Sequence, residues 1–145
     1  WFLAKEEKAD PYKAVMMALF HDVPEARSGD QNWVHKKYVK VFEEEIIADQ
    51  LRDLPGSADL LQFAKEYNQR KTLESRIAKD ADLLDQILLL KEYDRQGNKE
   101  AAEWLKGAQQ YDRLVTKSAK KLAKEILKQK TNAWWNNSWT PERRA

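Results

Sequence analysis

The sequence has no cysteine, and only four glycines, four prolines and two histidines among its 145 residues. Without cysteine, neither disulfides nor thiolate metal sites can hold the chain together, and this composition suits a reducing compartment, so we expect a cytoplasmic protein. No apolar run approaches the roughly 18 residues needed to cross a bilayer, and no signal-peptide pattern is present, so we expect no membrane partner. The formal net charge is only +2. Binding to nucleic acid is therefore not expected.

The residues that are abundant indicate a single globular domain. Charged residues make up 34% of the chain and apolar residues 42%, which is typical of a folded, highly charged soluble protein. A chain of this length buries a sizeable core without covalent cross-links. We therefore predict one domain over residues 1–145.

Apolar residues recur at helical spacing, and no stretch shows the alternation of a β-strand. Residues 1–8 have the pattern of a helix end, so we expect an incomplete N-terminal helix that begins upstream of Trp1. Asp10 is predicted to cap the next helix, with Pro11 at its first position. Pro24 disfavours helical backbone at the residue before it, so this helix is expected to end near Asp22.

Further helices are predicted over 36–53 and 72–96, and a short helix between them is predicted to begin with Ser57 as its cap. A last helix is predicted over about 99–130, with a kink near Gly107. In the first of these, Val39, Phe42, Ile46, Ile47 and Leu51 are expected to face inward. The tail from about residue 131 is expected to be packed or partly disordered, and ordered only where its tryptophans dock. The prediction is an all-α protein of five or six helices.

The predicted helix over residues 11–22 leads into the stretch ALFHDVPEARSGD, which places a histidine beside an aspartate. Adjacent helical residues point about 100° apart, but at a helix end both side chains can flank one small ion beyond the terminus. Divalent cations accept imidazole nitrogen and carboxylate oxygen at about 2.0–2.2 Å. His21 and Asp22 are therefore candidate metal ligands, although the dipeptide alone is a weak signal.

The wider pattern resembles the HD-domain metal-dependent phosphohydrolases, and among them the 5′-deoxynucleotidase branch. The resemblance is carried by MALFHDVPEARSGD, IAKDADLLDQILLLKEYDRQGN, NWVHKKYVKVFEEEIIADQLRDLP and the closing WW. It implies an HD-domain helical bundle around a metal site, and a homodimer. It also implies an enzyme that removes the 5′-phosphate from deoxynucleoside monophosphates by means of a water molecule activated by a divalent ion. Mn²⁺, Co²⁺, Zn²⁺, Mg²⁺ and Ni²⁺ all accept such ligands, so the sequence does not name the metal.

The resemblance also implies particular residues. The family's metal site takes an upstream histidine, a His-Asp pair and a distant aspartate. In this sequence the last three correspond to His21, Asp22 and Asp82, and the upstream histidine is expected before the first residue. Glu25 and Asp30 occupy the family's catalytic positions. One role is that of general acid or base, and the other is binding of the water or the sugar. The sequence does not show which of the two carboxylates has which role.

The distant aspartate has neighbours of the same type. Asp80, Asp82 and Asp85 lie within six positions of one another, and helical periodicity does not choose among them. The resemblance favours Asp82, and the other two are interpreted as polar neighbours or as partners of the ligands. Lys79 is the first candidate for binding the substrate phosphate, with Arg27, Lys36 and Lys37 as further cations. The second histidine, His35, is interpreted as part of a solvated, lid-like loop.

Parts of the sequence are also compatible with three other functions. The basic stretch DRLVTKSAKKLAKEILKQK, followed by tryptophans, could bind nucleic acid as a non-catalytic basic helix. We favour a packed amphipathic helix there, because Leu114, Leu122 and Ile126 form an apolar stripe. Within the superfamily, the alternatives are a nucleotide phosphodiesterase or a triphosphohydrolase. A third possibility is an HD protein that binds without catalysing a reaction.

Overall fold

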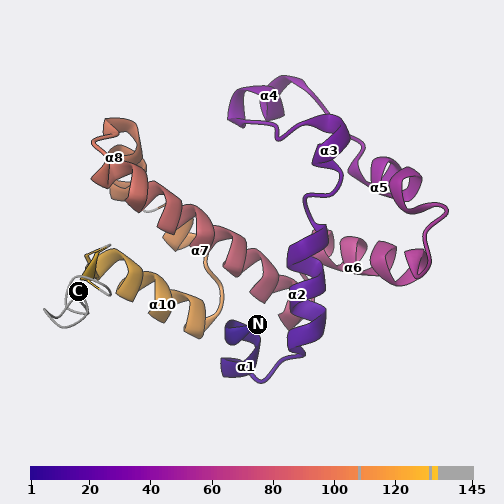
Figure 1. Cartoon of the computed structure of the whole chain (residues 1–145), viewed down its shortest axis with the longest axis horizontal. Coiled ribbons are helices and arrows are strands. Elements are labelled where there is room, and N and C mark those ends of the chain that lie inside the picture. The colour runs from indigo at the N-terminus through magenta and orange to yellow at the C-terminus, as the bar shows by residue number, and fades with distance from the viewer. Residues whose placement is uncertain (108, 131, 134–145) are drawn as a thin grey trace, which may run out of the picture. The chain divides into compact units, whose positions relative to one another are not determined.

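The computed structural model describes residues 1–107, 109–130 and 132–133, and every regular element in these ranges is a helix (Figure 1). The predicted all-α class is therefore confirmed. The chain divides into two compact units, Trp1–Lys79 and Asp80–Ala145, with the boundary inside α7 (Leu73–Arg95). A single domain over 1–145 stays a prediction. The predicted docking of the tail tryptophans lies outside the described residues.

The first unit is built around the second helix of the chain. It contains α1 (Phe2–Glu6), α2 (Pro11–Phe20), α3 (Glu25–Ser28), α4 (Trp33–Tyr38), α5 (Glu43–Leu51), α6 (Ser57–Gln69) and the start of α7. α2 packs against α1 and α6, and α5 packs against α6. Met17, Tyr67 and Ala78 form a buried cluster on which Ala18 and Phe63 pack. This cluster fixes the C-terminal end of α2.

The beginning of α2 agrees with the sequence prediction. Asp10 is the N-cap, and its Oδ1 accepts hydrogen bonds from the backbone N–H groups of Tyr12 at 2.9 Å and Lys13 at 3.2 Å. Pro11 occupies the first helical position, where a missing N–H costs nothing. The helix ends at Phe20, so the next residues of the chain lie at its C-terminus.

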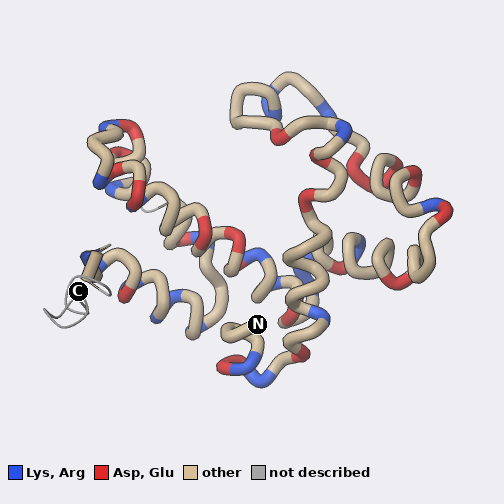
Figure 2. Tube along the Cα trace, in the orientation of Figure 1, with Lys and Arg blue, Asp and Glu red and all other residues tan. Residues whose placement is uncertain are grey.

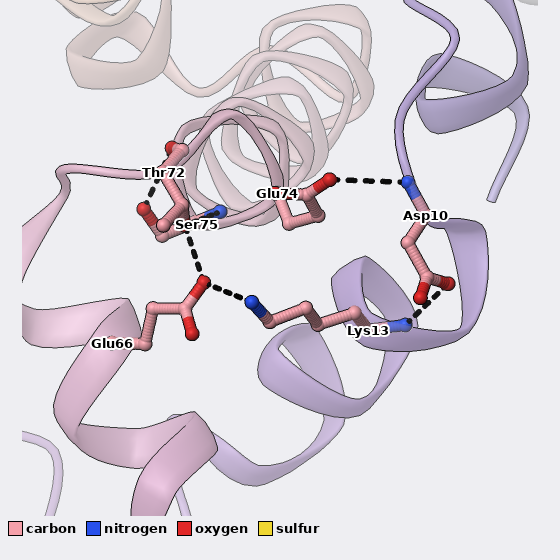
Figure 3. Close-up of polar contacts among 6 residues, drawn as sticks. All are labelled: Asp10, Lys13, Glu66, Thr72, Glu74 and Ser75. Carbon is pink, nitrogen blue, oxygen red and sulfur yellow. Dashed lines mark hydrogen bonds and ion pairs between the residues drawn. The ribbon is translucent and has the colours of Figure 1, made fainter.

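A buried carboxylate joins three helices of the first unit (Figure 3). Glu66 on α6 is only 8% exposed. Its Oε1 accepts hydrogen bonds from Lys13 Nζ on α2 at 2.6 Å and from Thr72 Oγ1, just before α7, at 2.5 Å. Nearby, Glu74 Oε1 accepts a hydrogen bond from the backbone N–H of Asp10 at 3.1 Å. These contacts hold the N-terminal end of α2 against the α6–α7 connection.

The Glu66 network makes stability depend on pH. Burial alone would raise the pKa of Glu66, but hydrogen bonds from Lys13 and Thr72 and the charge of Lys13 outweigh burial, so this pKa lies below the ordinary 4.5. A carboxyl with a lowered folded-state pKa stabilises the fold above its unfolded pKa, and this contribution disappears as pH falls through the folded value. We expect Glu66→Gln to lower the free energy of unfolding at neutral pH by about 1–3 kcal/mol. Urea denaturation should show that the difference in free energy of unfolding between the wild type and Glu66→Gln becomes smaller below pH 4.5. A difference that does not change with pH would contradict the stabilising role of the Glu66 carboxylate.

The helix predicted over residues 36–53 is two helices, separated by a non-helical segment over 39–42. Val39 has φ −120° and ψ 131°, and the β-branched Val39 and Val41 favour extended backbone over helix. Val39 is 49% exposed and Phe42 56% exposed, so the predicted inward orientation of these two side chains is wrong. The later part of the pattern holds, because Ile47 and Leu51 of α5 are buried as predicted.

The second unit contains the rest of α7, α8 (Lys99–Lys106), α9 (Gln109–Asp112) and α10 (Lys117–Lys128). The single helix predicted over 99–130 is therefore wrong, since three helices occupy that range. Thr116 explains the start of the last one, because its side chain accepts a hydrogen bond from Ala119 N–H as the N-cap of α10. Within the described part of the chain, no helix has the length and apolar character needed to span a membrane.

A buried aspartate of α7 holds the beginning of α10. Asp80 is 1% exposed and accepts hydrogen bonds from Val115 N–H at 3.0 Å, Thr116 N–H at 2.8 Å and Thr116 Oγ1 at 2.6 Å. The carboxylate thereby satisfies backbone donors that the start of a helix leaves without partners. Asp80 is a structural residue of the second unit.

A lysine of α7 holds the other end of α10. Lys91 Nζ donates to the carbonyl of Leu127 at 3.2 Å and also to those of Ile126 and Gln129, and burial lowers its pKa. The partners of Asp80 and Lys91 lie 35 to 38 residues further along the chain. Because this offset is nearly constant, α7 and α10 run side by side in the same direction (Figure 1).

Candidate metal centre

The predicted ligand pair lies directly after the last turn of α2. His21 Nδ1 is 2.7 Å from the carbonyl oxygen of Ala18, and a carbonyl can only accept, so Nδ1 carries the proton. In the neutral ring, the other nitrogen, Nε2, then presents its lone pair. That nitrogen is 3.0 Å from Asp22 Oδ1. The two side chains that sequence analysis named as ligands therefore converge on one point.

This convergence requires a positive charge. Two lone pairs facing each other repel, and a proton on Nε2 or a cation bound by both atoms removes the repulsion. Two ligands bound at about 2.1 Å with a right angle between them lie about 3.0 Å apart, which matches the spacing of 3.0 Å between His21 Nε2 and Asp22 Oδ1. The hydrogen bond from Nδ1 to a backbone carbonyl is the partner that metal-binding histidines commonly have. The pair thus fits a divalent cation.

An aromatic side chain supports the histidine ring. The centroid of Tyr67 lies 4.8 Å from that of His21, and the guanidinium of Arg70 lies 3.4 Å from the centroid of Tyr67. The side chain of His21 is 15% exposed, whereas that of Asp22 is 58% exposed. This contact is not predictable from the sequence. Tyr67 could be predicted only as an inward-facing residue of its helix, because periodicity carries no information about which ring it touches.

The two predicted catalytic carboxylates come from the segment that follows α2. Glu25 begins α3, and Asp30 follows Gly29, which ends that helix with φ 73°. Burial, followed by repulsion from Asp22 and then from Asp30, raises the pKa of Glu25, while Lys36 and His21 partly oppose the shift. Electrostatic coupling therefore links Glu25 with both the proposed ligand pair and Asp30. It favours the protonated form of Glu25.

The predicted phosphate-binding cations occupy different surroundings. Lys36 is exposed and acts electrostatically on Glu25, so it lies on the side of the carboxylates. Arg27 has its Nη1 3.9 Å from Asp49 Oδ2 on α5, and Lys37 Nζ lies 5.2 Å from the centroid of Tyr38. Lys79 is half-buried at the end of the first unit, and its role in binding phosphate stays a prediction.

The three aspartates of α7 differ in surroundings. Asp80 is buried and bound to the start of α10, Asp82 is half-buried, and Asp85 is exposed. Asp80 therefore has a structural role. Asp82 belongs to the second unit and the His-Asp pair to the first. Among the described residues, no group of three or more histidine, cysteine, aspartate or glutamate side chains is close enough together to hold a metal ion. Asp82 as a ligand stays a prediction.

The second histidine is helical, contrary to its predicted place in a loop. His35 lies within α4, which Asn32 caps by accepting hydrogen bonds from the backbone N–H groups of Val34 and His35, each at 3.0 Å. An Asn at the N-cap position favours helix over loop, and Asn32 is therefore the signal in the sequence for this helix. The side chain of His35 is exposed, in agreement with the predicted solvation of this segment.

A cavity of about 200 Å³ opens beside the histidine. Its walls come from the end of α2, from α5 and from α6, and combine apolar and polar side chains. The lining residues are His21, Pro24, Glu43, Glu44, Ile47, Leu61, Ala64, Lys65, Tyr67 and Asn68. A cavity with apolar walls and a few polar groups is the usual form of a small-molecule site. Because His21 belongs to both, the cavity adjoins the candidate metal centre.

A family model described as an HD domain matches residues 1–127. No curated protein and no solved structure matches the chain.

Proposed function

The chain belongs to the HD domain family, whose members are generally metal-dependent hydrolases, and we propose that it removes the 5′-phosphate from deoxynucleoside monophosphates. The observation that carries this proposal is the pairing of His21 Nε2 with Asp22 Oδ1 at 3.0 Å, with the other ring nitrogen held by a backbone carbonyl. As part of the same proposal, the protein is a cytoplasmic homodimer and residues 1–145 form one HD domain.

In this proposal, His21, Asp22 and Asp82 hold the divalent ion. When bound, such an ion supplies Lewis acidity and lowers the pKa of a water molecule, which suits hydrolysis of a phosphate monoester. Ala18 fixes the histidine tautomer through its carbonyl oxygen. The protein's own residues then position the phosphate and manage the protons, which are the main requirements of phosphoryl transfer.

Glu25 is the proposed general acid. The departing sugar 5′-oxygen is a poor leaving group and needs a proton, and a carboxyl with a raised pKa keeps its proton closer to neutral pH. Asp30 would then orient the water or bind the sugar. Lys36, which acts on Glu25 electrostatically, and Lys79 are the proposed phosphate-binding cations. A positive charge beside the carboxylates offsets the repulsion that they exert on a phosphate dianion.

Replacing Glu25 with glutamine separates the chemical role from metal binding. We expect Glu25→Gln to retain the ion while kcat falls about 10²–10⁴-fold, the usual range for losing a general acid or base. Phosphate release gives kcat, and calorimetric titration with Mn²⁺ gives the affinity for the metal. A Glu25→Gln protein that no longer binds Mn²⁺ would identify Glu25 as a ligand instead.

The cavity beside His21 is proposed to receive the nucleoside part of the substrate. Its apolar wall includes Leu61 and Ala64, and Asn68 and Lys65 supply polar groups that can contact a base or a sugar hydroxyl. We expect Ala64→Trp, which fills this space, to raise KM for deoxynucleoside monophosphates at least tenfold more than for a small phosphate ester. Ala58→Trp is the matched control, because Ala58 lies on the same helix with an exposed side chain. Equal effects on both substrates would place the nucleoside elsewhere.

Phosphate release from deoxynucleoside monophosphates by the full-length protein tests the proposed activity. We expect inorganic phosphate only when Mn²⁺, Co²⁺ or a similar ion is added, and none in the presence of a chelator. Absence of phosphate release with every metal would contradict the proposal. Nucleotide diesters and deoxynucleoside triphosphates belong in the same experiment, since faster cleavage of either would identify one of the alternative HD activities.

A further inference from the structure

The segment around α4 exposes an unusual amount of apolar side chain. Trp33 is 65% exposed, Val34 67%, Tyr38 74%, Val39 49% and Phe42 56%, and α4 has no buried residue. With about 100° per helical residue, the first three lie within about 140° of one side of the helix. We call these five residues the α4 surface. Exposed apolar groups of this density mark an interaction site.

Charges of both signs border the α4 surface (Figure 2). Lys37 Nζ lies 5.2 Å from the centroid of Tyr38, and Lys40 Nζ lies 5.4 Å from that of Phe42. These lysines therefore fold over the exposed rings. The next residues are the exposed glutamates that open α5, and one groove is lined by Lys40, Phe42, Glu43, Glu44 and Glu45. In this groove a cation, an apolar ring and three anions thus follow one another.

This order of groups is complementary to itself. In a two-fold symmetric contact the same surface is used by both copies, so a residue pair formed across the interface occurs twice, once in each direction. Rotation by two-fold symmetry can bring Lys37 and Lys40 of one copy against the glutamates of the next, with the apolar groups between them. The adjacent carboxylates would repel a nucleic acid or an anionic membrane. We propose that the α4 surface binds a second copy of this chain and forms the interface of a two-fold symmetric dimer.

This inference rests on the homodimer proposed above, but not on the hydrolytic activity. Sedimentation measures the mass of the protein and phosphate release measures its activity, so the two proposals can fail separately. Lys36 is left unchanged in the test, since it acts on Glu25. Two charge-reversed variants are made in the full-length protein: Lys37→Glu with Lys40→Glu, and Glu44→Lys with Glu45→Lys. Every replaced side chain is exposed, so both variants are expected to fold, which circular dichroism checks.

We expect the wild-type protein to sediment as a dimer at tens of micromolar, and each charge-reversed variant to sediment as a monomer. Mixed in equal amounts, the two variants should recover the mass of a dimer, because an acidic surface then meets a basic one. Lys117→Glu with Lys120→Glu on α10, also exposed, is the matched control and should remain dimeric. Tyr38→Glu should give a monomer that neither variant rescues.

A monomeric wild-type protein would overturn the proposal, and would mean that another segment or partner covers the α4 surface. Dimers in both charge-reversed variants would place the interface elsewhere. Failure of the equal mixture to form dimers would refute the pairing of lysines with glutamates.

Discussion

The Asp22→Ala protein is expected to bind no divalent ion tightly and to release phosphate roughly 10³-fold more slowly than the wild type, because metal catalysis supplies several kcal/mol. Asp22 Oδ1 lies 3.0 Å from His21 Nε2, and alanine removes half of this pair. The histidine keeps its hydrogen bond to the carbonyl of Ala18. The loss should therefore appear in metal binding and turnover and leave the helical signal intact.

Two variants of α7 extend this prediction. Asp82→Ala should match Asp22→Ala in losing both the metal and the activity, because Asp82 is the proposed distant ligand. Asp85→Ala should retain both, since its exposed side chain has no role in the proposed site. Calorimetric titration with Mn²⁺ and phosphate release measure the two properties. An equal loss in Asp85→Ala would show that the wrong carboxylate was assigned, and an active Asp22→Ala protein would exclude the site.

The Asp80→Ala protein is expected to lose about 2–4 kcal/mol of stability without a direct loss of a metal ligand. Its buried carboxylate accepts two backbone hydrogen bonds and one from the Thr116 hydroxyl, and a buried donor that loses its acceptor costs about 1–3 kcal/mol. Alanine leaves the buried Thr116 N–H without this acceptor, so α10 loses its anchor at the N-terminus. Urea denaturation measures the change in free energy of unfolding.

Asp85→Ala is again the matched control, because it removes an exposed aspartate from the same helix and should change stability by no more than about 0.5 kcal/mol. Asp80→Asn should fall between the two, since its amide oxygen can still accept hydrogen bonds but its NH₂ group cannot. Equal stability of Asp80→Ala and Asp85→Ala would contradict the structural role of Asp80.

Local signals in the sequence predicted the elements that depend on few residues. Asp10 and Pro11 located the start of α2, and Pro24 the region of its end, because capping and proline geometry act within a few residues. The helix predicted over 72–96 agrees with α7 (Leu73–Arg95) for the same reason. The predicted pairing of His21 with Asp22 also rests on a local signal, because two adjacent side chains can flank one point at a helix end.

Features that depend on contacts between distant residues could not be predicted in this way. The break before α10 follows from Asp80, whose partners lie 35 and 36 residues away, and no periodicity in residues 99–130 reveals it. Tyr67 beside His21 is a further example. The exposure of Val39 and Phe42 could not be predicted either. Their spacing would place them on the inward face of a helix, but the chain is not helical at these two residues.

Anomalous diffraction from crystals of the full-length protein grown with Mn²⁺ would locate the ion directly. We expect one strong anomalous peak within about 2.0–2.3 Å of His21 Nε2 and a carboxylate oxygen of Asp22, with a carboxylate oxygen of Asp82 at a similar distance. Diffraction from crystals that contain Mn²⁺ at other sites and none between His21 and Asp22 would contradict the proposed metal centre.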